Sequence, residues 1–162
     1  MPLLENGQVT QDRWYMAAEG EALPDGAVIV PLARLEEGLA RAGDAPLGVI
    51  IAPDVDVAAL RAALPRLELV AVTFPSFRDG RAFTQARALR EHLGFTGEIR
   101  ATGTPLPDQY EFLLRCGVTT VQTERTEDVS VWQQAHTIIS IAYQPSTLHE
   151  RPQGLGLRRF LS

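Results

Sequence analysis

The chain has 162 residues, 45% of them hydrophobic and 22% charged, which fits a single globular domain with a buried core. The formal net charge of −5 argues against a general affinity for nucleic acid, because binding to phosphates needs a basic surface. A single cysteine, Cys116, excludes an intramolecular disulfide framework and any cysteine-rich metal or iron–sulfur site within one chain.

The N-terminal segment, residues 1–15, predicts a β-hairpin. Asn6-Gly7 accepts the positive φ angles of a type I′ turn and is flanked by short apolar stretches. Trp14 and Tyr15 follow, and we expect them to hold the hairpin against the main body. Pro24-Asp25-Gly26 is a second turn that leads into the core.

After this turn the chain alternates between strand and helix patterns. The predicted strands cover residues 27–32, 47–52, 67–74, 98–102 and 118–123. The predicted helices cover residues 33–42, 57–64, 82–93 and 106–116, and another begins near 126. Residues 137–143 either extend that last helix or form a sixth strand, because they are rich in β-branched side chains.

This order predicts an α/β fold of repeated right-handed βα units with a mainly parallel sheet. Two closures fit the length: a partial β/α barrel, which we prefer, or a doubly wound open sheet. We expect one α/β domain over residues 1–145, including the hairpin. Residues 146–162 then form a tail that is flexible or docks on a partner.

The candidate site gathers at one edge of the sheet. In both closures the functional loops lie at the C-terminal ends of the strands, and residues 74–103 read as a strand, a polar loop, a helix and a second strand. We predict a site there that binds an anion or another ligand. Its side chains are Asp79, Arg81, Gln85, Arg100, Asp108 and Gln109.

Each of these residues also has a structural explanation. Asp79 can cap the following helix, while Arg81 and the first helical amides can cradle an anion. Arg100 lies inside a strand, where a lone guanidinium is costly, so it is paired or faces a ligand. Asp108 complements the dipole of the helix that it begins, and it can also be the partner of Arg100.

No catalytic residue, metal site or cofactor is predicted. Cys116 ends a helix on the side of the sheet opposite the candidate site, which favours a buried structural thiol. The histidines His92, His136 and His149 lack metal-ligand spacing, and neither a P-loop nor a dinucleotide fingerprint follows the first predicted strand.

Long motifs in this region resemble a known family. They are FPSFRDGRAFTQARALREHLGFTGEIRATG from Phe74, then DQYEFLLRCG and AYQP. They resemble the bacterial domain-of-unknown-function family number 934, associated through gene neighbourhood with assimilatory sulfite reduction. The family pattern falls on Phe74, Pro75, Phe77, Asp79, Gly80, Arg81, Gln85, Ala86, Arg87, Arg100, Gly103, Asp108, Gln109, Arg115, Cys116 and Gly117. Pro107 and Val118 depart from it, since arginine and phenylalanine are usual there.

Three functions remain open on this basis. The resemblance implies an accessory protein of sulfite reduction that binds a small oxyanion or a protein partner of that system. The alternatives are a small enzyme acting on a sulfur oxyanion or a phosphorylated metabolite, and a structural interaction subunit. No apolar run approaches the ~20 residues that cross a bilayer, and no secretory signal is evident, so we expect a cytoplasmic protein with no membrane partner. We also expect a homodimer.

Overall fold

A computed structural model describes residues 1–124 and 129–138. Its strands are β1 Leu3–Glu5, β2 Gln8–Thr10, β3 Tyr15–Met16, β4 Val28–Pro31, β5 Leu47–Ile51, β6 Leu69–Phe74, β7 Glu98–Gly103 and β8 Thr120–Gln122. Its helices and 3₁₀ turns are η1 Leu32–Arg34, α1 Leu35–Leu39, η2 Val57–Leu60, η3 Leu64–Arg66, α2 Arg81–Glu91, η4 Pro107–Gln109 and α3 Tyr110–Arg115. Residues 129–138 are also helical.

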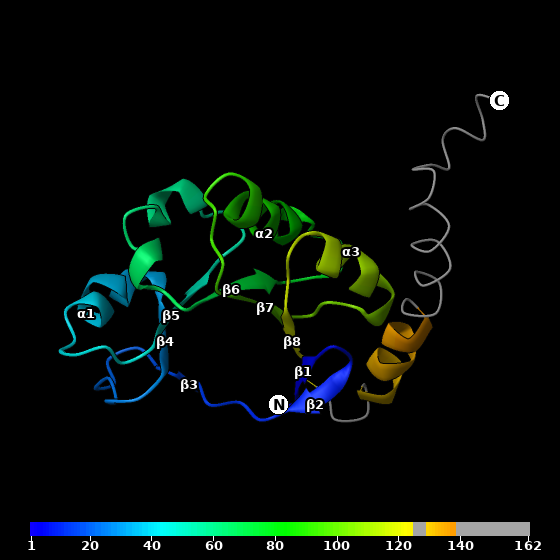
Figure 1. Cartoon of the computed structure of the whole chain (residues 1–162), viewed down its shortest axis with the longest axis horizontal. Coiled ribbons are helices and arrows are strands. Elements are labelled where there is room, and N and C mark those ends of the chain that lie inside the picture. The colour runs from blue at the N-terminus through cyan, green and yellow to red at the C-terminus, as the bar shows by residue number, and fades with distance from the viewer. Residues whose placement is uncertain (125–128, 139–162) are drawn as a thin grey trace, which may run out of the picture.

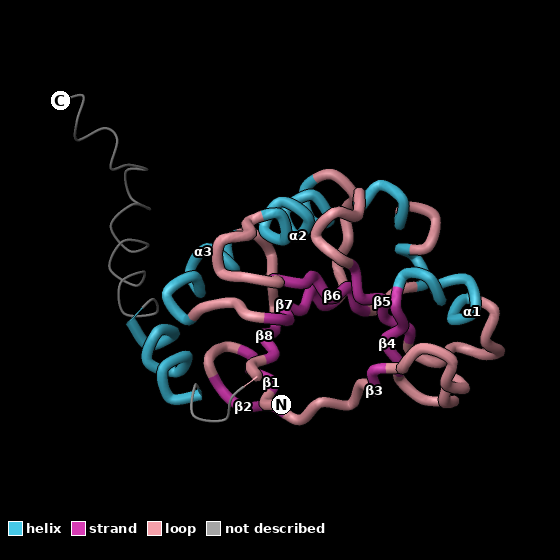
Figure 2. The backbone as a smooth tube through the Cα atoms, turned by 180° about the vertical axis from the view of Figure 1, so that it is seen from behind, coloured by secondary structure: helices cyan, strands magenta, loops and turns pink. Residues whose placement is uncertain are grey.

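All eight strands form one sheet in the order β2-β1-β8-β7-β6-β5-β4-β3. The strands from β3 to β8 run parallel, each beside its neighbour in the chain. The sheet curls into an arch with the helices along its outside, and the segment between β2 and β3 crosses the open side (Figures 1 and 2). The predicted α/β fold with a partial barrel is therefore confirmed, in place of the doubly wound alternative.

The N-terminal hairpin is confirmed and extends the sheet. Asn6 and Gly7 both have positive φ, 52° and 74°, as a type I′ turn requires. β1 pairs antiparallel with β2 on one side and with β8 on the other, so the hairpin covers the edge that β8 would expose.

The two faces of the sheet differ in what they pack against. The outer face carries the main core, which consists of aliphatic strand residues such as Val30, Val49, Val72 and Ile99 under the helices. On the inner face, Ile29, Leu69 and Ala71 form a smaller apolar cluster with Trp14 and Ile50 against it. Trp14 therefore holds the segment after the hairpin to the body, as expected. Tyr15, for which we expected the same, lies in β3 and is 47% exposed.

Two details differ from the sequence prediction, and one prediction is described only in part. Residues 57–64 do not form one short α-helix but the 3₁₀ turns η2 and η3, with Pro65 inside the second. β3 was not predicted, since a strand of two residues has too little alternation to detect. Only the part of the uncertain segment 137–143 up to residue 138 is described, and it is helical.

The predicted tail, residues 146–162, lies outside the described residues. Among the helices that are described, none has the length and apolar character needed to span a membrane.

Candidate functional site

Two neighbouring strands fix the loops at the predicted edge. Gly103 ends β7 with φ of 87°, and a Cβ there would lie 2.3 Å from the carbonyl oxygen of Phe74 at the end of β6. The backbone N–H and the hydroxyl of Thr104 both donate to that same oxygen, at 2.8 and 3.1 Å. The loops that follow β6 and β7 therefore leave the sheet side by side.

Asp79 and Arg81 form a closed pair in the first of these loops. Asp79 accepts two hydrogen bonds from the Arg81 guanidinium, at 3.0 and 2.7 Å, and a third from its backbone N–H at 3.1 Å. Gly80 occupies the N-cap position, so Asp79 binds the first residue of α2 from just outside the helix. The Arg81 hydrogen bonds lower the pKa of Asp79 from 3.8 to about 2.

Gln85, one turn further along α2, is buried and turned toward a different loop. Its Nε2 donates to the carbonyl oxygens of Ala52 and Val55, at 2.8 and 2.9 Å, and so holds the loop after β5 against α2. Its Oε1 is buried and has no hydrogen-bond partner among the described residues. Because both neighbours of Nε2 are carbonyl oxygens, the amide orientation is fixed.

Gln109 joins the two motif segments. Its Oε1 accepts from the backbone N–H of Leu106 at 2.9 Å, and its Nε2 reaches the carbonyl oxygen of Phe77 at 3.5 Å. Asp108 beside it is exposed in the first turn of η4, where a carboxylate complements the helix dipole.

Three large apolar side chains are exposed around this junction. Phe77 is 56% exposed, Phe112 45% and Leu106 36%. An arginine lies over each phenylalanine ring: Arg78 is 5.4 Å from the centroid of Phe77, and Arg87 is 5.9 Å from that of Phe112. We call this group, Phe77, Arg78, Arg87, Leu106 and Phe112, the edge surface.

Arg100 belongs to a separate cluster on the inner face. Its side chain is 1% exposed, and it forms two hydrogen bonds with the Asp12 carboxylate, at 2.9 and 3.1 Å. On its other side, Nε and Nη2 donate to Glu98 Oε1 at 3.1 and 3.0 Å. The same oxygen accepts from Thr120 at 2.7 Å. The partner of Arg100 is thus not Asp108, the candidate that the sequence suggested.

A cavity of about 390 Å³ lies beside this cluster. Arg100, Glu98 and Thr120 line it from the sheet. Residues 11–14 line it from the segment between β2 and β3, here called the strap. Within the strap, Asp12 accepts from the backbone N–H of Trp14 at 3.0 Å, and Arg13 lies 5.0 Å above the Trp14 ring.

One pattern in the sequence pointed to part of this cluster. Glu98 and Arg100 are two apart in a strand and so share a face. No local pattern pointed to Asp12, because 88 residues separate it from Arg100.

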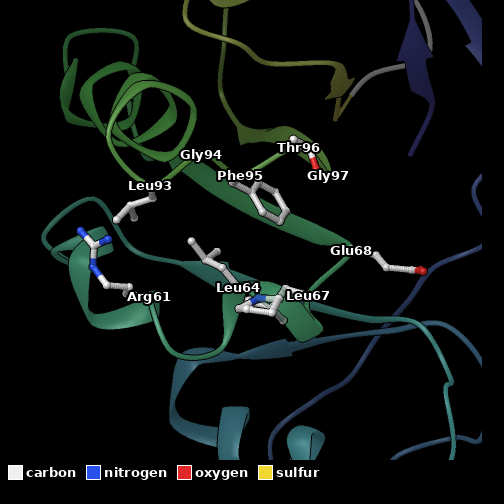
Figure 3. Close-up of a pocket in the computed structure, with 10 residues that line it drawn as sticks. Arg61, Leu64, Leu67, Glu68, Leu93, Gly94, Phe95, Thr96 and Gly97 are labelled. Carbon is white, nitrogen blue, oxygen red and sulfur yellow. The ribbon is translucent and has the colours of Figure 1, made fainter.

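Another cavity, about 440 Å³, opens at the opposite edge, before β6 and β7 (Figure 3). Its walls include the apolar side chains of Leu64, Leu67 and Phe95, and the charged Arg61 and Glu68 lie on opposite sides of it. Glu68 is already bonded to Arg13 at 3.3 Å. Polar groups do not converge on one point here, so this cavity is a weaker candidate for a binding site.

Cys116 is buried, as predicted. It follows α3 and contributes to the main core, and burial raises the pKa of its thiol. In the described part of the chain, no group of three or more histidine, cysteine, aspartate and glutamate side chains has the geometry to hold a metal ion.

The model of one protein family matches residues 48–154, and that family is described as bacterial proteins of unknown function, DUF934. The matched range contains the motif segments from Phe74 to Gly117, whereas the hairpin and the strap precede it. No curated protein matches the chain.

Proposed function

The chain belongs to this bacterial family of unknown function, and on that premise we propose that it is an accessory protein that docks to a protein partner through the edge surface. The observation that carries the proposal is the contrast between satisfied polar groups and exposed aromatic ones at this edge. Asp79 and Arg81 bind each other, and the side-chain nitrogen of Gln85 and the side chain of Gln109 bind backbone groups. Gln85 Oε1, which has no partner among the described residues, is buried rather than exposed at the edge surface.

The composition of the edge surface suits a protein partner. Aromatic and arginine side chains dominate the binding energy of protein interfaces, and here each of two exposed phenylalanines lies under a guanidinium. Arg78 adds local positive charge to a protein whose net charge is −5, whereas the charge of Arg87 is partly offset by Glu91, 3.8 Å away. The surface therefore favours a partner that presents apolar side chains flanked by carboxylates.

We place this partner in the sulfite-reducing system of the same bacterium. The support for this step is the association of the family with sulfite reduction; the geometry of the edge surface supports docking in general. The two steps need separate tests, because a protein with an intact docking surface can serve another system.

The test is a calorimetric titration of the purified chain with the sulfite-reducing enzyme of its own bacterium. We expect binding, and we expect Phe77→Ser to weaken it by at least about tenfold, the usual loss at an aromatic hot spot. Val131→Ser is the matched control, since Val131 is 48% exposed on the helix 129–138, away from the edge surface.

Two results would count against the proposal in different ways. No binding by the wild-type chain would remove the link to that enzyme. Binding that survives Phe77→Ser but is lost in Val131→Ser would move the docking site to the helix 129–138.

A further inference from the structure

We infer that the cavity beneath the strap is a binding site for a small, singly charged oxyanion such as a carboxylate, which takes the place of Asp12 on the fork of Arg100. The inference concerns the inner face of the sheet and does not depend on docking at the edge surface.

Arg100 is held ready for bidentate recognition. Glu98 accepts from one side of the guanidinium at 3.1 and 3.0 Å, and Thr120 donates to the same Glu98 oxygen at 2.7 Å. Glu98 and Thr120, which both belong to the sheet, therefore fix the orientation of the Arg100 guanidinium. Its remaining side points to the strap, where two parallel N–H groups meet the two oxygens of Asp12.

Asp12 is the more solvent-accessible partner of the pair. It lies on the connection between β2 and β3, and its side chain is 27% exposed while that of Arg100 is 1% exposed. Its carboxylate occupies one wall of a cavity of about 390 Å³, which is large enough for a small ligand beside the fork. The carboxylate of Asp12 thus shows which chemistry the open fork accepts.

The charges around the cavity select for a single negative charge. Glu5, Asp12 and Glu98 line it together with Arg13 and Arg100. When a monoanion displaces the Asp12 carboxylate from the Arg100 guanidinium, one negative charge takes the position of another. A dianion such as sulfate adds a second negative charge to a cavity already lined by Glu5 and Glu98, and the repulsion between these charges is costly.

The tethered carboxylate of Asp12 acts as an internal competitor. Ligand binds only the fraction of molecules in which the fork is free, and such minor states are commonly about 10% populated or less. Removing the carboxylate should therefore tighten binding of an external monoanion by at least about tenfold. Displacement also changes the surroundings of Trp14, whose backbone N–H donates to Asp12.

The experiment is a formate titration of the full chain, followed through the NMR signal of the Trp14 indole N–H, with chloride holding the ionic strength constant. Wild type is expected to show saturable binding, and Asp12→Ala to bind formate at least tenfold more tightly. Sulfate should bind both proteins more weakly than formate. Arg100→Lys should abolish the response, because an ammonium group lacks the fork.

Asp79→Ala is the matched control. It also removes a carboxylate bonded twice to an arginine, but in an exposed loop. Its formate affinity should equal that of wild type. If Asp12→Ala fails to fold, Asp12→Asn serves in its place, since it keeps the size of the side chain and loses the charge.

The remaining outcomes overturn the inference. Equal formate affinity in wild type and Asp12→Ala would show that no ligand takes the place of Asp12. If Asp12→Ala binds formate but wild type does not at any formate concentration, the Asp12–Arg100 pair only holds the strap against the sheet. Absence of binding in both proteins would exclude the site. None of these results bears on docking at the edge surface.

Discussion

At the scale of single residues, two arginines bind an aspartate in the same way but in different surroundings. All 15 basic residues of the chain are arginine. Arg81 and Arg100 each bind a carboxylate through two nitrogens, one in an exposed loop and the other in the buried inner face. Solvent screens the Asp79–Arg81 pair more than the Asp12–Arg100 pair. The first pair orders the loop before α2, and the second holds the strap against the sheet.

The Asp79–Arg81 pair should stay formed at a lower pH than an ordinary aspartate would allow. The folded-state pKa of Asp79 is about 2, below the ordinary value of 3.8, because Arg81 donates hydrogen bonds to its carboxylate. A depressed pKa means that the contribution of the pair to stability is present above pH 4 or so and is lost as the pH falls toward 2.

An NMR titration of the Asp79 carboxyl carbon measures this directly, in wild type and in Arg81→Gln. We expect a midpoint near 2 in wild type and a return to the ordinary range in the variant. A wild-type midpoint close to 4 would show that the pair is not formed in solution.

At the scale of elements, the sequence predicted most of the fold because each βα unit carries its own signals. The centre of the predicted strand 67–74, residues 69–72, has no polar alternation, as expected for strands covered on both faces. Gly94 predicted the end of the helix before β7. Residues 57–64 were predicted less well, because Pro65 and the short length leave only 3₁₀ turns. The candidate site was predicted in part: the edge loops do adjoin, but the main partner of Arg100 lies 88 residues away.

Arg90 connects three elements and shows how arginine stabilises this fold. From α2 its guanidinium donates to the carbonyl oxygens of Phe95 and Gly97 at 2.8 Å each, and to that of Gly117 at 2.8 and 3.1 Å. It therefore joins the end of α2, the start of β7 and the loop before β8. These carbonyl groups would otherwise be left without partners near the base of the sheet.

We expect Arg90→Lys to lower the free energy of unfolding by about 1–3 kcal/mol, because an ammonium group cannot reach all three carbonyls. Urea denaturation measures the free energy of unfolding of this variant. The control is Arg61→Lys, a change at an exposed position that should lower the free energy of unfolding by less than about 0.5 kcal/mol. Equal losses in the two variants would show that the three-carbonyl contact contributes little.

At the scale of the whole molecule, the sheet is an arch whose two ends are β2 and β3. The hairpin pairs with β8, and the short β3 pairs with β4. The free edges of the sheet are therefore those of β2 and β3. Val9 in β2 is exposed, as are Tyr15 and Met16 in β3. Exposed apolar side chains on free strand edges are normally covered by another chain.

We therefore predict that the protein is a homodimer that pairs through one of these edges. Sedimentation equilibrium measures the mass in solution, and Val9→Lys tests the edge of β2 by placing a charge on it. A dimer that Val9→Lys dissociates would assign the contact to β2, and one that only Met16→Lys dissociates would assign it to β3. A monomeric wild-type chain at all concentrations would contradict the prediction.

The central claim is that the edge surface is where a protein partner docks. Hydrogen–deuterium exchange of the chain, alone and with the sulfite-reducing enzyme of its bacterium, tests it most directly because every backbone segment reports at once. We predict slower exchange on binding in residues 75–81 and 106–112, which carry Phe77, Leu106 and Phe112. Unchanged exchange in these two segments, with protection confined to the strap or to the helix 129–138, would contradict the claim.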